Sequence, residues 1–80
     1  MMVIVYVIRS LKDSRFYVGM TKDLERRIQE HESGKTKSTK GFRPWKLIFT
    51  ESFQSYSEAR KREKYLKSGS GKEYIKRMAP

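Results

Sequence analysis

One glutamate in this sequence stands where hydrophobic burial does not explain it. Glu63 lies four residues after Ala59 and three before Leu66, on the stripe that a helix through this segment would turn inward. A carboxylate is costly to bury unless a cation, a hydrogen-bond network or a metal ion compensates its charge. Glu63 is therefore predicted to be either half of a salt bridge to an arginine or a metal ligand.

A second pair of side chains could bind and act on a phosphate. Arg27 and His31 are four residues apart on one face of a predicted helix, where Arg27 borders the apolar stripe of Leu24 and Ile28. A guanidinium suits a phosphate because its planar fork donates two parallel hydrogen bonds and keeps its charge. The plainer interpretation is a solvated helix face, since a single histidine is more often a packing or surface residue than a catalyst.

Two tyrosines fall in adjacent strand-like segments. Taken singly, Tyr6 and Tyr17 are predicted to be core aromatics of a hairpin, with hydroxyls that need partners when buried. A cluster of cations would favour the phenolate and make one of them a general base. An unperturbed phenol, with a pKa of about 10, is a poor base.

The elements that position these residues follow from hydrophobic periodicity. Residues 2–9 and 15–19 predict an antiparallel hairpin, and residues 45–51 predict a third strand. Three helices are predicted: about 21–32, capped by Thr21 or its neighbour and closed by Gly34, then 57–67, capped by Ser57, and, after a break at 68–71, a last one at 72–77. The expected fold class is α+β, a three-stranded antiparallel sheet flanked by helices in β-β-α-β-α-α order.

Length and composition limit what the chain can be. Eighty residues support one small domain, here 1–80. The absence of cysteine and the single histidine rule out a Cys-based zinc site, so any metal must be held by oxygen. The apolar run at 3–8 is too short to cross a bilayer and lacks the pattern of a signal peptide, so we expect a cytoplasmic protein.

The net charge predicts a polyanionic partner. Nineteen Lys and Arg against nine Asp and Glu give a formal charge of +10, and nucleic acid is a commoner partner than a membrane for such a chain. A membrane partner is not favoured, because no long basic amphipathic helix is predicted. Residues 33–46 contain no acidic residue and predict an exposed loop, which is either solubilising or a phosphate-contacting segment through Lys35, Lys37, Lys40 and Arg43. RNA binding stays open.

Several short stretches occur in a recognisable order along nearly the whole chain. They are Tyr6, Tyr17-Val18-Gly19, the run 22–27 with His31, then 57–59 and 62–67. Together they resemble the GIY-YIG nuclease superfamily, in particular its small stand-alone bacterial members and the N-terminal nuclease domain of the excinuclease C subunit. The chain departs from the family pattern in having Ile4-Val5-Tyr6 for Gly-Ile-Tyr, in Met20 after the second motif, and in lacking asparagine.

The resemblance implies a role for each matched residue. Tyr6 matches the tyrosine that closes the first motif, and Tyr17 and Gly19 match the tyrosine and glycine of the second. Arg27 matches the family arginine, and His31 stands where relatives place histidine or tyrosine. The implied catalytic residues are thus Tyr6, Tyr17, Arg27 and His31, with Gly19 as a structural residue.

The resemblance also implies a reaction. Glu63 matches the glutamate that holds a single divalent ion, Mg²⁺ or Mn²⁺, and such an ion fills its other positions with water and substrate phosphate. The reaction is hydrolysis of a DNA phosphodiester, with Tyr17 or Tyr6 helping to activate water and Arg27 stabilising the phosphate. A structure-selective role in DNA repair or recombination would follow. The alternative is a nucleic-acid-binding module without catalysis, or a subunit of a repair complex.

Overall fold

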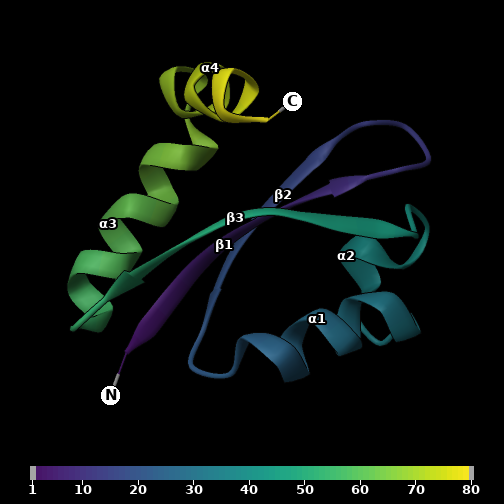
Figure 1. Ribbon diagram of the computed structural model, residues 1–80, viewed down its shortest axis with the longest axis horizontal. Coiled ribbons are helices and arrows are strands. Elements are labelled where there is room, and N and C mark those ends of the chain that lie inside the picture. The colour runs from purple at the N-terminus through teal and green to yellow at the C-terminus, as the bar shows by residue number, and fades with distance from the viewer. Residues whose placement is uncertain (1, 80) are drawn as a thin grey trace.

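The computed structural model describes residues 2–79 (Figure 1). Its strands are β1 (Val3–Ser10), β2 (Phe16–Thr21) and β3 (Trp45–Phe53). Its helices are α1 (Leu24–Ser33), α2 (Lys37–Lys40), α3 (Tyr56–Lys67) and α4 (Gly69–Met78). The predicted α+β class and element order are confirmed, with α2 added. Over these residues, every helix is too short or too polar to cross a bilayer.

The sheet is antiparallel and has β1 at its centre, between β2 and β3. Tyr6 lies opposite Gly19 and Ile8 lies opposite Tyr17 in the β1–β2 ladder. The β1–β3 ladder has an irregularity after Val7. Because β1 is covered on both faces, it is apolar along nearly its whole length.

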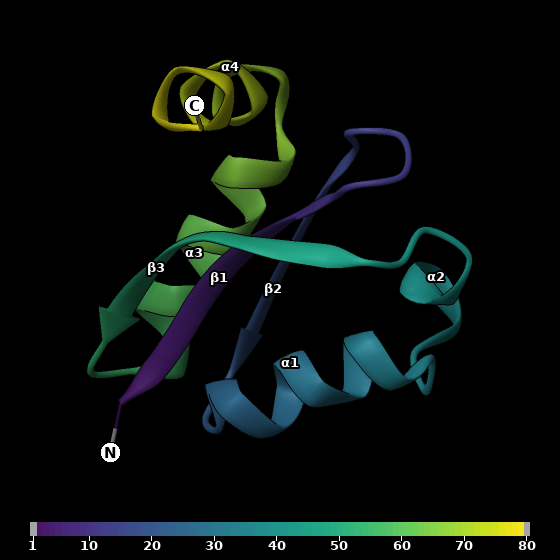
Figure 2. The same cartoon turned by 45° about the vertical axis from the view of Figure 1, so that its right-hand side comes forward.

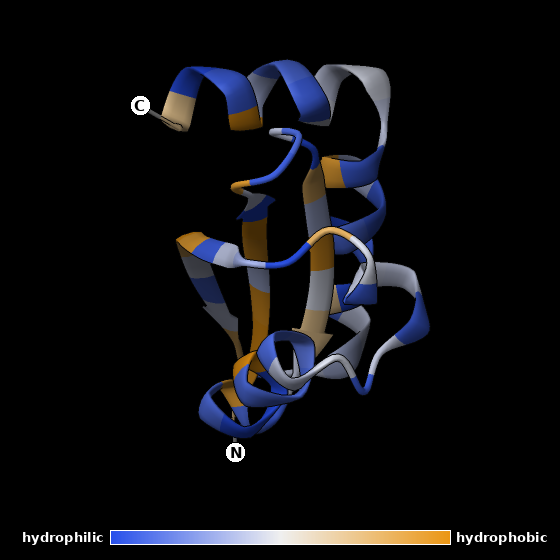
Figure 3. Cartoon of the chain, turned by 90° about the vertical axis from the view of Figure 1, so that its right-hand side faces the viewer, coloured by the Kyte–Doolittle hydropathy of each residue, from blue (hydrophilic) through white to orange (hydrophobic). Residues whose placement is uncertain are grey.

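Alternate residues of β1 enter two separate cores, since successive side chains of a strand point to opposite faces. On one face, Val3, Val5 and Val7 pack with apolar residues of α3 and α4. On the other, Tyr6 and Ile8 pack with residues of α1 and the start of β3. Figures 1 and 2 show α3 and α4 on one side of the sheet and α1 and α2 on the other. Figure 3 shows the hydrophobic residues following the strands, while the helices are largely hydrophilic.

The helix termini differ in part from the predicted ones. α1 begins after Asp23, whose side chain accepts a backbone hydrogen bond in the first turn, and ends at Gly34. Gly34 has a φ of 82°, the left-handed conformation that glycine adopts readily. α3 is capped by Ser55 and not by Ser57, because the Ser55 side chain accepts the N–H of Glu58.

The predicted break before α4 is confined to Ser68. The Ser68 side chain accepts the N–H of Gly71, so the helix already begins at Gly69. A Cβ at Gly71 would overlap the carbonyl oxygen of Tyr65 and the Cα of Leu66. Glycine at this position does not break the helix; it lets α4 pack directly against the end of α3.

We expect Gly71→Ala to lower the free energy of unfolding by about 3 kcal/mol, because the added methyl meets backbone atoms that cannot rotate away. Gly69→Ala is the matched control, since nothing lies near its Cβ position and alanine favours helix. Urea unfolding followed by circular dichroism measures both variants. Equal stabilities would show that the crossing of α3 and α4 adjusts freely.

The basic segment 33–46 is more ordered than the predicted loop. It contains α2, and Thr39 within α2 is fully buried. Trp45 Nε1 donates to the Thr39 carbonyl at 2.9 Å, and Arg43 donates to the carbonyls of Lys40 and Glu32. The small polar residues of this segment are typical of loops, so the burial that organises it has no signature in the sequence.

Candidate active site

Tyr6, Tyr17, Arg27 and His31 come together on the α1 face of the sheet. The Tyr6 hydroxyl is 2.8 Å from His31 Nε2, and Arg27 Nε donates to the same hydroxyl at 3.3 Å. The Tyr17 ring packs edge-on against His31, with 4.9 Å between ring centroids. β1, β2 and α1 each supply part of this cluster, so it forms only when the sheet and α1 pack together.

A fifth residue, Thr39 of α2, completes the hydrogen-bond chain. Its hydroxyl lies 2.8 Å from His31 Nδ1 and donates to the carbonyl of Thr36. Because the single hydroxyl hydrogen is used on that carbonyl, the Thr39 oxygen accepts from Nδ1–H. Nε2 of His31 is then the free acceptor, and the Tyr6 hydroxyl donates to it.

Sequence reasoning did not identify Thr39. It lies in a polar, lysine-rich segment, and a threonine there carries no pattern that distinguishes it from a loop residue. Its function becomes visible only when α2 packs beside α1 and places the hydroxyl against His31.

Thr39→Val retains the shape of the side chain but removes the acceptor of His31 Nδ1–H. We expect it to lower the free energy of unfolding by about 1–3 kcal/mol, the usual cost of a buried unsatisfied donor. Thr39→Ser restores the hydroxyl and is expected to recover most of that loss. Chemical unfolding of the wild type and of both variants measures the stability. The ¹⁵N chemical shifts of the His31 ring report its tautomer. Unchanged ring shifts in Thr39→Val would contradict the assigned tautomer.

The buried site keeps both Tyr6 and His31 neutral at neutral pH. Burial raises the pKa of Tyr6 to about 12, although its hydrogen bond with Arg27 acts in the opposite direction. Burial and the positive charge of Arg27 lower the pKa of His31 below its ordinary value. His31 can therefore accept the hydrogen bond of the Tyr6 phenol without itself carrying a proton on Nε2.

The lowered pKa of His31 predicts a loss of stability in acid. The unfolded chain regains an ordinary histidine pKa of about 6.5, so it binds more protons than the folded chain below that pH. The contribution of His31 is complete above about pH 6.5 and is lost as the pH falls through the folded-state pKa. We expect the urea midpoint to fall between about pH 7.5 and pH 5, and to fall less in His31→Gln. Parallel curves for both proteins would refute this assignment.

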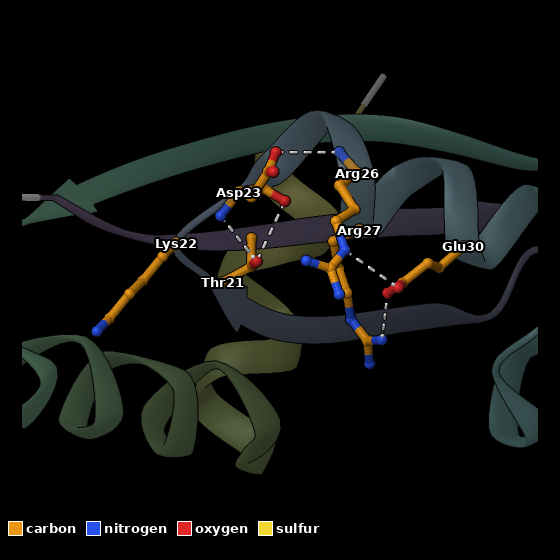
Figure 4. A pocket seen from close by; sticks show the side chains of 6 residues that line it. All are labelled: Thr21, Lys22, Asp23, Arg26, Arg27 and Glu30. Atoms are coloured by element: carbon orange, nitrogen blue, oxygen red, sulfur yellow. Dashed lines mark hydrogen bonds and ion pairs between the residues drawn. The ribbon is translucent and has the colours of Figure 1, made fainter.

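Arg27 is held as a cation at the edge of a polar cleft. Burial disfavours its charge, but hydrogen bonds to Glu30, Tyr6 and Tyr17 outweigh burial and raise the pKa of Arg27. The cleft, of about 270 Å³, is formed by the end of β2 and the first half of α1. Figure 4 shows the side chains of Lys22 and Arg27 extending to the same side of α1. Two cations on one side of an open cleft suit a phosphate group.

Gly19 leaves room beside the β2 backbone for the Tyr6 hydroxyl and the Tyr17 ring. A Cβ built on Gly19 would lie 2.5 Å from the Tyr6 hydroxyl oxygen and 3.0 Å from a ring carbon of Tyr17. Any side chain here would push the Tyr6 hydroxyl away from His31 and Arg27. The requirement for glycine in this motif is therefore steric.

Glu63 lies on α3, across the sheet from α1, and is 6% exposed. Among residues 2–79 its hydrogen bonds go to its own helix: Arg60 Nη1 at 2.9 Å and Lys67 Nζ at 3.2 Å. The structure thus gives it ion-pair partners, and does not join it by a hydrogen bond to the cluster around Tyr6. The link between the two sites is Lys67, which borders a second cleft together with Tyr17.

The single carboxylate of Glu63 is compatible with a divalent ion that the protein binds weakly. Residues 2–79 contain no group of three or more acidic or histidine side chains that would form a complete metal site. Mg²⁺ needs only one or two carboxylates when water and substrate phosphate fill its other positions. The side chains of Arg60 and Lys67 are 56% and 53% exposed, so both cations can turn to solvent and release the carboxylate.

The predicted DNA-contacting residues lie around α2. Lys35, Lys37 and Lys40 are exposed, so their ammonium groups are available to phosphates. Arg43 is also exposed, but its guanidinium donates to two backbone carbonyls. Lys35 borders a cleft that shares Arg26 and Glu30 with the cleft of Arg27. Neighbouring clefts therefore connect Lys35, just before α2, with the Arg27 side chain.

This fold and cluster of residues define a GIY-YIG catalytic domain. The model of that family matches residues 2–77, and the chain belongs to the GIY-YIG family. Membership implies a nuclease-type domain that binds nucleic acid.

Within the family, the similar proteins are small UPF0213 proteins. The chain is 46% identical over 63 residues to "UPF0213 protein YazA" of Bacillus subtilis (strain 168), a match that covers 78% of this chain and 63% of that relative. It is 40% identical over 73 residues to "UPF0213 protein SSP2268" of Staphylococcus saprophyticus, covering 90% and 88%. The solution structure of the UPF0213 protein BH0048 from Bacillus halodurans matches with a TM-score of 0.59 and 38% identity, covering 98% of this chain and 85% of that one.

Proposed function

We propose that the protein is a divalent-metal-dependent endonuclease that hydrolyses phosphodiester bonds of DNA in the cytoplasm. The observation that carries this proposal is the cluster of Tyr6, Tyr17, Arg27 and His31, in which Arg27 hydrogen-bonds both tyrosines and borders an open cleft together with Lys22 and Arg26. A module that only binds nucleic acid needs surface lysines. It does not need a buried chain of hydrogen bonds that holds one guanidinium in place.

Of the two tyrosines, Tyr17 is assigned to activate the water. Tyr6 is 1% exposed and its hydroxyl is enclosed by His31 and Arg27, so neither water nor phosphate reaches it. Tyr17 is partly exposed and borders an open cleft. Tyr6 is instead a positioning residue, because its hydroxyl accepts from Arg27 Nε and so orients the guanidinium.

The reaction then follows as an in-line displacement. The Tyr17 hydroxyl accepts a hydrogen bond from the attacking water and orients it. As the water oxygen bonds to phosphorus, the water gives its proton to solvent, and the bond from phosphorus to the leaving sugar oxygen breaks while that oxygen takes a proton from solvent. The guanidinium of Arg27 stabilises the negative charge that develops on the phosphate oxygens. Glu63 is the residue that would hold Mg²⁺ or Mn²⁺, which as a Lewis acid supplies further charge stabilisation when bound.

The basic surface favours a substrate recognised through its backbone. Lys22, Arg26 and Lys35 lie along the connected clefts, and such contacts hold phosphates without reading bases. We therefore propose weak sequence preference and selection of DNA by structure, as in repair or recombination.

The test is cleavage by the purified protein of supercoiled plasmid and of a panel of single-stranded, nicked, flap and junction DNAs. Cutting is expected with Mg²⁺ or Mn²⁺ and not with EDTA. Arg27→Ala protein, purified in the same way, detects a contaminating nuclease, because equal cutting by that variant would assign the activity elsewhere. Salt-sensitive binding with no cutting in either metal would replace the proposal with the binding module.

A further inference from the structure

A second cleft lies between the edge of the sheet and the helices on the face opposite α1. It measures about 280 Å³ and is formed by the first half of β2, the end of α3 and α4. Phe16 is a partly exposed apolar wall, the buried side chains of Leu66 and Ile75 lie beneath the cleft floor, and Lys67 and Lys72 stand at its border. The clefts beside Arg27 and α2 are lined by charged and polar residues or backbone, so this one differs in chemistry.

The walls and the border of this cleft suit different parts of one ligand. Apolar walls beside an aromatic ring favour a flat, weakly polar group, whereas exposed lysines favour an anion. The volume is just below the roughly 300 Å³ at which pockets begin to hold drug-sized molecules. A single nucleotide combines a flat heterocycle with a phosphate at about this size.

The strand that borders the cleft can contribute polar contacts as well. In the sheet of residues 2–79, β2 is an edge strand that pairs with β1, so its outer edge is not used by that sheet. The main-chain N–H and C=O groups of such an edge are free to bond a ligand. They would provide donors and acceptors for the edge of a base without any additional side chain.

Because Tyr17 borders this cleft, the cleft lies next to the proposed site of hydrolysis. Tyr17 borders the cleft on one side and packs against His31 at 4.9 Å on the other. A base inside the cleft would therefore belong to a nucleotide next to the bond under attack. Bases of a paired duplex are stacked and cannot enter a pocket unless they are flipped out, so the cleft would select an unpaired nucleotide.

We propose that this cleft binds the base of an unpaired nucleotide adjacent to the cut bond, with Lys72 contacting its phosphate. The proposal rests on the proposed function, since it names the structural feature of DNA that the nuclease recognises. Lys67 joins the contact when its ammonium leaves Glu63.

The test measures binding in EDTA, so that no cutting intervenes. The probes are two DNA hairpins that carry one 2-aminopurine, either unpaired as a bulge or paired in the stem. We expect the protein to bind the bulged hairpin about tenfold more tightly, the value of one stacked base, and to change the fluorescence of the bulged base. Equal affinities with unchanged fluorescence would overturn the proposal.

Two variants and one control locate the effect. Phe16→Ala removes the partly exposed aromatic wall and is expected to abolish both the preference and the fluorescence change. Lys72→Met removes an exposed charge with little risk to folding and is expected to weaken binding of the bulged hairpin several-fold. Lys46→Met removes an exposed charge from β3, at the other edge of the sheet, and is expected to keep the preference. An undiminished preference in Lys72→Met and Phe16→Ala would overturn the assignment to this cleft.

The two proposals fail in different ways. Metal-dependent, Arg27-dependent cutting with no preference for the bulge would leave the nuclease and remove the base-binding cleft. A bulge-specific fluorescence change without cutting in either metal would leave the cleft and remove the nuclease.

Discussion

Arg27→Ala will lower the rate of DNA cleavage about 1,000-fold while binding of DNA weakens far less. The guanidinium is the cationic group that its own hydrogen bond to the Tyr6 hydroxyl orients beside an open cleft. Removal of one oriented donor to a developing negative charge typically costs a factor of about 100–1,000. Tyr6 keeps its hydrogen bond to His31 in this variant, so the fold is expected to survive. Single-turnover cleavage and equilibrium binding separate the two effects.

Two further substitutions separate the effect of an oriented guanidinium from the effect of positive charge alone. Arg26→Ala removes an arginine that borders the same cleft but has a side chain 75% exposed and a long ion pair, 3.5 Å, to Glu30. The cleavage rate of this variant is expected to fall by less than about tenfold, as for an exposed charge. Arg27→Lys keeps the charge but loses the planar fork, and is expected to lie much closer to Arg27→Ala. Equal losses in Arg26→Ala and Arg27→Ala would mean that charge alone matters and that the orientation of Arg27 does not.

Glu63→Gln is expected to abolish metal-dependent cleavage, with a loss of about 1,000-fold, or about 4 kcal/mol in the barrier. The amide keeps the size of the carboxylate but cannot balance the charge of a divalent ion. Arg60 and Lys67 lose their ion-pair partner in this variant, yet both side chains are more than half exposed and can be solvated. The free energy of unfolding is therefore expected to change little.

Metal binding gives a measurement that does not depend on cutting. Mn²⁺ titration followed by electron paramagnetic resonance, with DNA present, should detect an ion in the wild-type complex and none in Glu63→Gln. Lys67→Met is the informative companion, since removal of the competing ammonium should tighten Mn²⁺ binding. Full cleavage by Glu63→Gln at saturating Mg²⁺ would show that this glutamate serves only the ion pairs within α3.

The secondary structure could be predicted well where local patterns determine it. β1 is a dense run of valine and isoleucine, and the apolar spacing of α1 repeats along one helical face. Helix ends were less predictable, because Ser55 and Ser57 are both acceptable caps and only the path of the chain selects Ser55. The run of serine and glycine at 68–71 predicts a break, since the sequence does not show that Gly71, inside α4, packs against Tyr65.

The candidate site, like the secondary structure, could be predicted from the sequence only in part. The types and order of Tyr6, Tyr17, Arg27 and Glu63 determined, from the sequence alone, the family and the reaction to be considered. The sequence left open which tyrosine faces the substrate, and burial of Tyr6 favours Tyr17. It also left open what compensates Glu63, which the structure pairs with two cations of its own helix.

What the chain determines by itself is the set of elements and the chemistry that they carry, because periodicity and side-chain type are local properties. Tertiary structure alone decided that Thr39 completes the chain through His31 to Tyr6, and that Tyr17 both packs against His31 and borders the cleft between β2 and the helices α3 and α4. Contacts between residues far apart in sequence depend on how the sheet and helices pack. That packing arises from the sum of many weak interactions, and no short stretch of sequence encodes it.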